Sequence, residues 1–360
     1  MTKHEEISRW LREKIADGGF PVNSKIPSEN KLAARFGCSR QTVRQAIGTL
    51  EAAGIVSRAQ GSGTFVSRRT AKTSRAATMR VGVITTYLDD YIFPGIIQGI
   101  ERVLSARHYS MVLGITYNRQ TDEESALRQM LENGVDGLII EGTKTALPNV
   151  NELLYQEIIE HGIPIVFLNS CHRGCTEARV VMNDILAGEL ATNALISKKH
   201  RRLGGIFKSD DLQSLHRYEG MQRSVKQAGL SLPDASVLWY TTEDIPYLFS
   251  GSFDHMILSR FEHTTGLVCY NDQIAVSLIR LLHRYGKNVP DDYSIVSFDN
   301  SALAENIACG LTSVIYPARE IGEQAAGLLF KKLDDPSCRE HIVIRPEIQF
   351  RSSVRSISEV

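Results

Sequence analysis

The stretch FGCSRQTVRQAI, residues 36–47, contains a glycine in a short turn, followed by the first turns of an amphipathic helix. Val43 and Ile47 lie four residues apart, the spacing that places two side chains on one face of a helix. Because this apolar face must pack inward, polar residues near the helix N-terminus are expected to point outward. These outward residues are Arg40, Gln41 and Arg44. A helix, a short turn with glycine and a second helix make a helix–turn–helix.

The segments on either side of this motif complete a small domain. Residues 3–17 carry apolar side chains at helical spacing, which predicts a first helix. Ser28 is placed to cap a second helix, and Gly37 is placed to end it. Beyond the third helix, β-prone runs lie on both sides of the glycine-rich turn 59–63, which predicts a hairpin. We expect an α+β winged helix–turn–helix over residues 1–69.

The outward side chains of this domain suit duplex DNA. Arg can pair bidentately with guanine and Gln with adenine, whereas Ser and Thr hydroxyls and helix N-terminal amides suit phosphate oxygens. The glycine-rich hairpin tip is small enough to enter a minor groove. The residues expected to contact DNA on these grounds are Ser39, Arg40, Gln41, Thr42, Arg44, Gln60 and Gly61. The alternative is a solvated helix face on a small protein-binding domain.

The charge of the chain is distributed unevenly, and this favours DNA over that alternative. The whole chain has 41 Lys and Arg and 41 Asp and Glu. Residues 1–70 contain 12 basic and 6 acidic side chains, whereas the remainder contains 29 basic and 35 acidic ones. A basic first part on an acidic body is expected when only the first part meets a polyanion.

The body of the chain shows a different pattern. Residues 70–79 lack apolar periodicity and read as a linker. From residue 80, short apolar runs alternate with amphipathic helices, which predicts parallel βαβ units. We expect an α/β domain over 80–360 with two doubly wound parallel-sheet lobes. The expected first lobe comprises about 80–184 and 316–335, and the second comprises about 186–312 and 342–356.

Polar and aromatic residues follow several predicted strands of the body. The carboxyl ends of parallel strands line the ligand crevice of doubly wound sheets, so these side chains are expected to meet in a cleft. Carboxylates, amides and an Arg among aromatic rings suit a polyhydroxy ligand, because each hydroxyl both donates and accepts. The alternative for each residue is a helix cap. The candidate effector contacts are Tyr87, Asp90, Phe93, Glu141, Lys144, Asp184, His216, Arg217, Asn271, Asp272 and Asp299.

Enzymatic, metal and membrane functions find little support. The sequence contains no Gly-x-Ser-x-Gly, no His-Glu-x-x-His and no phosphate-binding loop, so no catalytic residues are predicted. Cys171 and Cys175 flank His172, but zinc-ligand spacing is absent, which favours reduced thiols and no metal or cofactor. The apolar runs are strand-sized and no signal segment is present, so a cytoplasmic protein without membrane contact is expected. A sugar-binding transport protein and a sugar-modifying enzyme remain as alternatives.

The first part of the chain resembles the winged helix of GntR-type regulators. The resemblance lies in residues 26–33, 36–46, 54–56 and 61–66. It implies operator contacts by the Glu29 region, Arg40, Gln41, Arg44 and the hairpin tip, and Lys3 is included with them. This chain departs from the family at Asn30, where many members carry an Arg that contacts phosphate.

The body resembles the effector domain of LacI/GalR-type regulators across residues 80–350. Segments that carry the resemblance include 134–139, 162–166, 217–220, 270–275, 289–299 and 311–314. It implies Arg217, Asn271 and Asp299 as the main hydroxyl contacts.

The pairing of these two domain types, together with residues 141–144 and 146–149, resembles arabinose-responsive repressors. This resemblance implies L-arabinose as the effector, with another pentose, a hexose or a nucleoside as the alternative. It further implies a homodimer on a palindromic double-stranded DNA operator.

Overall fold

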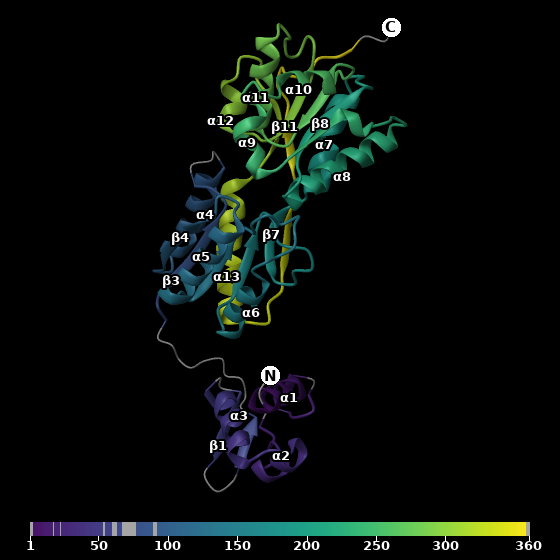
Figure 1. Cartoon of the computed structure of the whole chain (residues 1–360). Helices are drawn as coiled ribbons and strands as arrows, with labels where there is room; N and C mark the ends of the chain where they lie inside the picture. The colour runs from purple at the N-terminus through teal and green to yellow at the C-terminus, as the bar shows by residue number, and fades with distance from the viewer. Residues whose placement is uncertain are drawn as a thin grey trace. The chain divides into compact units, whose positions relative to one another are not determined.

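A computed structural model describes residues 3–16, 18–21, 23–52, 55–59, 63–66, 77–88 and 92–357. The chain divides into two compact units, Met1–Ala77 and Thr78–Val360. Figure 1 labels their helices and strands. Most of the expected linker lies outside the described residues, as do Gln60, Gly61 and Asp90.

The first unit is a three-helix domain with a two-stranded antiparallel hairpin. Ser28 accepts a hydrogen bond from the Lys31 amide at 3.4 Å and so caps α2. Gly37 ends that helix with φ of 58°, in the left-handed region that glycine adopts without strain. The expected core residues Val43 and Ile47 are buried. The elements are α1 (Lys3–Ala16), α2 (Glu29–Phe36), α3 (Arg40–Ala52), β1 (Val56–Ala59) and β2 (Gly63–Val66).

The second unit contains two six-stranded sheets, and each sheet with its helices forms one lobe. The first lobe has strand order β13-β7-β6-β5-β3-β4, all parallel. Helices α4 and α13 pack together beside this sheet, and α5 and α6 pack together over a separate apolar cluster. Its elements are β3 (Arg80–Thr85), α4 (Phe93–Ser105), β4 (Ser110–Ile115), α5 (Gln120–Asn133), β5 (Gly137–Ile140), α6 (Glu152–Glu160), β6 (Ile165–Leu168), β7 (Ala178–Met182), α13 (Ala318–Asp334) and β13 (His341–Ile344).

The second lobe has strand order β14-β12-β11-β10-β8-β9, and only β14 runs antiparallel to its neighbour. Its helical elements are α7 (Asp184–Ile196), α8 (Leu212–Gln227), α9 (Ile245–Leu248), α10 (Asp254–Phe261), α11 (Asp272–Arg284), α12 (Ala302–Asn306) and the 3₁₀ turns η1 (Asp234–Ser236) and η2 (Thr242–Asp244). Its strands are β8 (Leu203–Lys208), β9 (Val237–Tyr240), β10 (Gly266–Cys269), β11 (Ser294–Asp299), β12 (Thr312–Ile315) and β14 (Glu347–Gln349).

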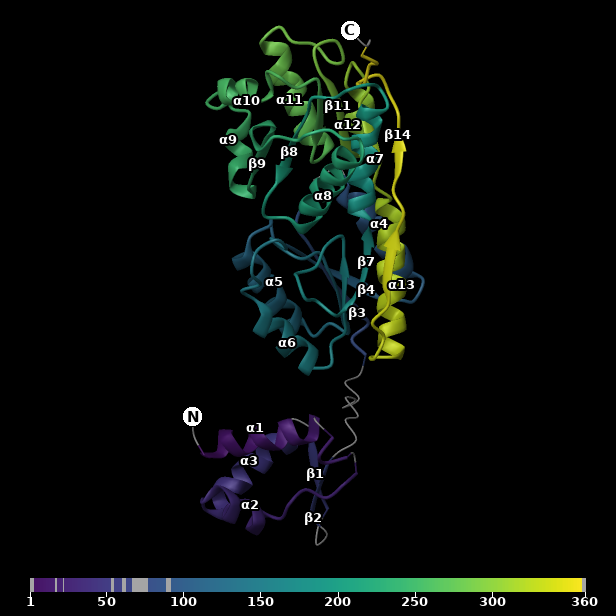
Figure 2. The same ribbon diagram turned by 90° about the vertical axis from the view of Figure 1, so that its right-hand side faces the viewer.

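The C-terminal segment departs from the lobe assignment expected from the sequence. Residues from 342 onward were expected in the second lobe, but β13 pairs in parallel with β7 in the first. Ile342 and Ile344 alternate with exposed neighbours and pack against the first lobe's core, so β7 has a partner at its open edge. The chain then enters the second lobe at β14, and Figure 2 shows this yellow segment passing from one lobe to the other.

Glycines allow two helix pairs to approach closely. A Cβ on Gly188 of α7 would lie 2.0 Å from the Arg217 carbonyl oxygen of α8, and one on Gly220 would lie 2.1 Å from the Ile185 oxygen. In the first lobe, a Cβ on Gly322 of α13 would lie 2.2 Å from the Ile96 oxygen of α4. The α7–α8 contact brings the Arg217 side chain against the N-terminus of α7.

No helix in the described part of the chain is both long and apolar enough to cross a membrane.

Candidate functional site

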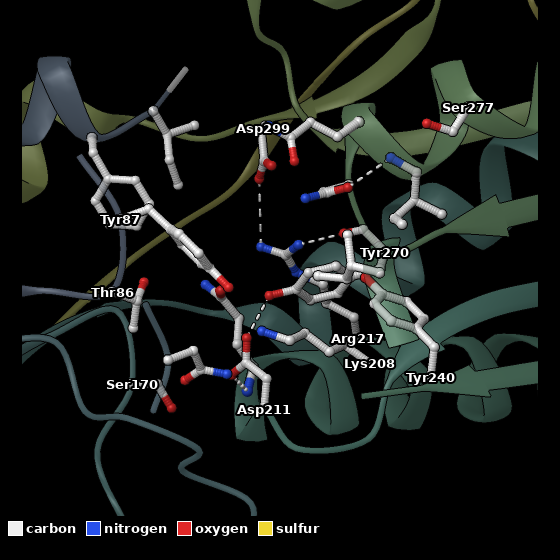
Figure 3. A pocket seen from close by; sticks show the side chains of 18 of the residues that line it. Thr86, Tyr87, Ser170, Lys208, Asp211, Arg217, Tyr240, Tyr270, Ser277 and Asp299 are labelled. Carbon is white, nitrogen blue, oxygen red and sulfur yellow. Dashed lines mark hydrogen bonds and ion pairs between the residues drawn. The ribbon is translucent and has the colours of Figure 1, made fainter. Parts of the chain in front are cut away.

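A cavity of about 660 Å³ lies between the two lobes, where the carboxyl ends of their strands face each other. Thr86, Glu141 and Ser170 line it from the first lobe, and Tyr240 and Tyr270 line it from the second. Figure 3 shows these second-lobe tyrosines beside Arg217 and Asp299. Its size is in the range of small-molecule sites.

Arg217 lies at the base of the cavity and is 1% exposed. Its Nε donates to Asp184 Oδ1 at 3.0 Å, and its Nη1 donates to the Tyr270 carbonyl oxygen at 2.7 Å. Its Nη2 lies 3.7 Å from Asp299 Oδ1. Burial opposes the positive charge, but the Asp184 and Asp299 carboxylates outweigh it and raise the pKa of Arg217. The guanidinium is therefore a charged donor held rigidly in place.

Glu141 supplies a fixed acceptor on the opposite wall. Its Oε2 accepts from the Thr86 amide at 2.8 Å and from the Thr86 hydroxyl at 2.5 Å. Its Oε1 accepts from Asn169 Nδ2 at 2.6 Å. Burial raises the pKa of Glu141, while these hydrogen bonds lower it in part.

Several lining residues were not among the predicted contacts. The Tyr270 hydroxyl donates to Asp211, and burial raises the pKa of Tyr270 well above its usual value, so the phenol stays neutral. Asp211 also accepts from the Gln213 amide at 3.0 Å and so caps α8. Tyr240 and Tyr270 directly end or follow strands, as the predicted residues do, and the same positional signal would have found them. The unpredicted polar or aromatic lining residues include Thr86, Asn118, Ser170, Lys208, Asp211, Tyr240 and Tyr270.

The structure places seven of the eleven predicted effector residues on the cavity wall. These are Tyr87, Phe93, Glu141, Lys144, Arg217, Asn271 and Asp299.

The structure does not support ligand contact for three others. Asp272 is fully buried, and its oxygens accept from Ser297, Ser301 and Ser313, so it ties α11 to β11, β12 and the loop before α12. Asp184 accepts a hydrogen bond from Arg217. His216, the residue before Arg217, lines a second cavity instead. Position after a strand does not reveal which neighbour satisfies a carboxylate, so it did not separate these residues from those on the cavity wall.

Lys144 lines the cavity but also joins the lobes at its rim. Its Nζ lies 2.6 Å from Glu243 Oε1 and 3.4 Å from Asp210 Oδ2, both in the second lobe. Beside it, Asn118 Nδ2 donates to Thr242 Oγ1 at 2.6 Å. The hydrogen bond from Lys144 lowers the pKa of Glu243. We call the contacts of Lys144 and Asn118 with the second lobe the rim bridge.

The first unit carries the residues that were predicted to contact DNA. The Ser39 hydroxyl accepts from the Thr42 amide at 3.2 Å, which caps α3. Arg40, Gln41 and Arg44 are exposed, as expected for the outer face of this helix. Arg44 Nε donates to Glu29 Oε2 at 2.9 Å, which holds that arginine beside α2. Lys3 is exposed and pairs with Glu6 on α1.

Two family models match the chain. Residues 3–66 match the bacterial regulatory proteins of the gntR family, and residues 192–354 match the periplasmic binding protein-like domain. Both matches agree with the resemblances found in the sequence.

Among solved structures, the transcription regulator CcpA of Lactococcus lactis is 25% identical, with a TM-score of 0.67. It covers 77% of this chain and 99% of its own length. A CelR–cellobiose complex covers 91% of this chain and all of its own, with a TM-score of 0.67 at 20% identity, and shares the fold.

Two of the curated relatives cover nearly the full length of this chain. An arabinose metabolism transcriptional repressor of Geobacillus stearothermophilus is 37% identical over 99% of both chains. One from Halalkalibacterium halodurans is 33% identical over 98% of this chain and 96% of its own. The ribose operon repressor of Escherichia coli strain K12 is 28% identical over 77% of this chain and 82% of its own. The chain belongs to the family of arabinose metabolism transcriptional repressors, DNA-binding regulators and not enzymes, with a GntR-type domain and a periplasmic binding protein-like domain.

Proposed function

We propose that this protein represses sugar-utilisation genes and leaves its operator when a small sugar, with L-arabinose as the first candidate, fills the cavity between the lobes. The observation that carries the proposal is that cavity, where charged donors and acceptors from both lobes converge. A ligand that touches both lobes stabilises their closed arrangement, and hinge motion of this kind can change the geometry of attached domains.

The lining suits a sugar more than an apolar ligand. Arg217 offers donors, and Glu141 and Asp299 offer acceptors, so hydroxyl groups that do both can be satisfied on several sides. Aromatic rings supply the apolar surface that sugar C–H faces need. Tyr87 and Phe93 pack with ring centroids 6.2 Å apart, and Tyr240 packs with another lining tyrosine at 6.3 Å.

The proposed regulator is a cytoplasmic homodimer, with two first units on a palindromic operator. Helix–turn–helix domains read half-sites spaced by turns of the double helix, so a two-fold protein fits a two-fold site. Sugar binding would move the connections to the first units and misalign them on the DNA. A coupling free energy of about 1–3 kcal/mol is enough for a 5- to 150-fold change in operator affinity.

A second candidate keeps this architecture and changes the ligand. The ribose operon repressor of Escherichia coli is 28% identical over 77% of this chain, which favours another pentose as the main competitor. A hexose or nucleoside would use the same donors and acceptors.

A sugar titration tests the proposal directly. The purified protein is titrated calorimetrically with L-arabinose, D-ribose, D-xylose, D-galactose and adenosine, and the same ligands are added to an operator-binding assay. L-arabinose is expected to bind and to release the operator. If another ligand binds more tightly, that ligand replaces L-arabinose as the proposed effector. If no carbohydrate alters operator binding, the regulatory scheme is overturned.

A further inference from the structure

A second cavity of about 320 Å³ adjoins the larger one. Ser170 and Gln213 line both cavities, so the two are neighbours. The loop between β6 and β7 forms one wall of the second cavity, and Cys171 and Cys175 both line it. Cys171 is buried, whereas Cys175 is half-buried. A cavity lined by both cysteines therefore adjoins the proposed effector site.

A tight turn joins these two cysteines. The Cys175 amide donates to the His172 carbonyl oxygen at 3.1 Å. Gly174 has φ of 80°, a left-handed conformation that glycine adopts at little cost. The turn places both cysteine side chains on the wall of the same cavity. Both thiols are free.

An arginine holds the turn and faces the buried sulfur. Arg179 Nη1 lies 3.6 Å from Cys171 Sγ and donates to the Cys175 carbonyl oxygen at 3.1 Å. The hydrogen bond from Cys175 and the nearby guanidinium lower the pKa of Cys171 to about 7. Burial instead raises the pKa values of Cys269 and Cys309. Thiolate is the reactive form of cysteine, so Cys171 is set apart from those two thiols.

We propose that Cys171 and Cys175 form a redox-sensitive pair that hydrogen peroxide converts to a disulfide. The Cys171 thiolate attacks one peroxide oxygen, the O–O bond breaks, and sulfenic acid and hydroxide form. The Cys175 thiol, as its thiolate, then attacks the Cys171 sulfur. The S–S bond forms and the S–O bond breaks. The leaving hydroxide, which keeps the proton of the sulfenic acid, takes up the proton lost by the Cys175 thiol and departs as water. Peroxide is reduced by two electrons and the two thiols are oxidised.

The same loop contacts the wall of the larger cavity, so its oxidation is expected to change effector binding; this consequence rests on the proposed function. Asn169 donates to Glu141 at 2.6 Å, and the Ser170 hydroxyl donates to Thr145 Oγ1 at 2.9 Å. Both residues directly precede Cys171. A disulfide that tightens the turn pulls on these contacts, and we expect effector affinity to fall about fivefold or more.

The first arm of the experiment tests the chemistry without a sugar. The full chain is treated with hydrogen peroxide, digested without reduction and analysed by mass spectrometry for a Cys171–Cys175 cross-link. The wild type is expected to form it and to lose it with dithiothreitol. Cys175→Ser is expected to stop at a sulfenic acid that dimedone traps at residue 171, and Cys171→Ser to give neither product. Cys309→Ser is the matched control and should behave as the wild type.

Absence of the cross-link, or sulfenic acid formed equally at Cys309, would overturn the proposal. The second arm compares sugar titrations of the reduced and oxidised wild type and of Cys171→Ser treated with peroxide. If the cross-linked protein binds sugar with unchanged affinity, oxidation does not affect the larger cavity and that part of the proposal is wrong. If the reduced wild type binds no sugar at all, the proposed effector fails, while the cross-linking result still decides the thiol chemistry.

Discussion

At the scale of single residues, we expect substitution to have the largest effect where a charged side chain is buried among hydrogen-bond and ion-pair partners. Arg217 is almost fully enclosed, and its guanidinium reaches Asp184 and Asp299 at 3.0 and 3.7 Å. The ring of Phe298 lies beneath it at 4.5 Å. We expect an arginine at such a position to contribute both to stability and to the proposed ligand binding, so that its substitution changes both.

Arg217→Met is expected to abolish sugar binding and to lower the free energy of unfolding by about 3–5 kcal/mol, because it leaves buried carboxylates without their partner. Urea titration and calorimetry measure the two effects. Adding Asp184→Asn should restore part of the stability and none of the sugar binding. Arg223→Met, on the same helix but half-exposed, is the control and should change little. Equal losses in both arginine variants would contradict this reading.

Arg44 of α3 gives the clearest test of whether this helix contacts DNA bases. Its salt bridge with Glu29 holds an otherwise exposed guanidinium in one orientation. Arg44→Ala should cost about 1–3 kcal/mol of operator affinity and relax preference at one base pair. Binding to a panel of operator variants at constant salt measures both. Arg9→Ala removes one charge from the same unit and serves as the control. Uniform weakening across the panel would make Arg44 a phosphate contact.

At the scale of elements, one helix pair in each lobe packs closely through glycines at the contact. Gly188 and Gly220 let α7 meet α8, and Gly99 and Gly322 let α4 meet α13. A methyl group at any of these would clash with backbone, which does not move aside as a flexible side chain does.

Gly322→Ala is expected to destabilise the protein by about 1–3 kcal/mol, because its Cβ would force α4 and α13 apart. Gly327→Ala on the same helix meets open space and should instead stabilise by up to about 1 kcal/mol. Thermal unfolding of the two variants checks the pair. The prediction fails if both substitutions shift the midpoint in the same direction.

Gly188→Ala should behave as Gly322→Ala does in stability and differ in function. The Cβ at this position would press on the Arg217 backbone, so the guanidinium would move with α8. We expect weaker sugar binding for Gly188→Ala than for Gly322→Ala at equal fractions folded. Calorimetric titration below the unfolding transition measures the difference, and identical affinities would show that the α7–α8 contact does not position the arginine.

At the scale of the whole molecule, the rim bridge links the lobes outside most of the cavity wall. Thr242 Oγ1 accepts from Asn118 at 2.6 Å and donates to Asp210 Oδ2 at 2.7 Å. Glu243 completes the bridge with Lys144. Neither Thr242 nor Glu243 lines the cavity, so both can be changed without removing a ligand contact.

Thr242→Val is expected to lower sugar affinity several-fold, because the closed arrangement of the lobes becomes less populated before the ligand arrives. Glu243→Gln should have a smaller effect of the same sign, since its side chain is 60% exposed and surface ion pairs contribute about 0–1 kcal/mol. Isothermal titration measures the affinities. Unchanged affinity in the threonine variant would show that the rim bridge does not control closure.

The local elements were readable from the sequence because they depend on neighbours in the chain. The cap at Ser28, the break at Gly37 and the inward face with Val43 and Ile47 are consequences of backbone geometry over a few residues. The buried apolar runs likewise predicted parallel strands between helices, and the two parallel-rich sheets confirm this fold class. The paired GntR-type and LacI/GalR-type segments pointed to the same regulator family that the relatives show.

The tertiary structure alone decided how the strand-end residues divide their work. Arg217 and Asp299 line the cavity. Asp272 also follows a strand, but its carboxylate accepts hydrogen bonds from three serines of β11, β12 and the loop before α12. The lobe that receives β13 was decided by the open edge of β7, over 150 residues earlier in the chain. Periodicity encodes which face of an element is apolar. The partner of a polar side chain depends on segments that only the folded chain brings together.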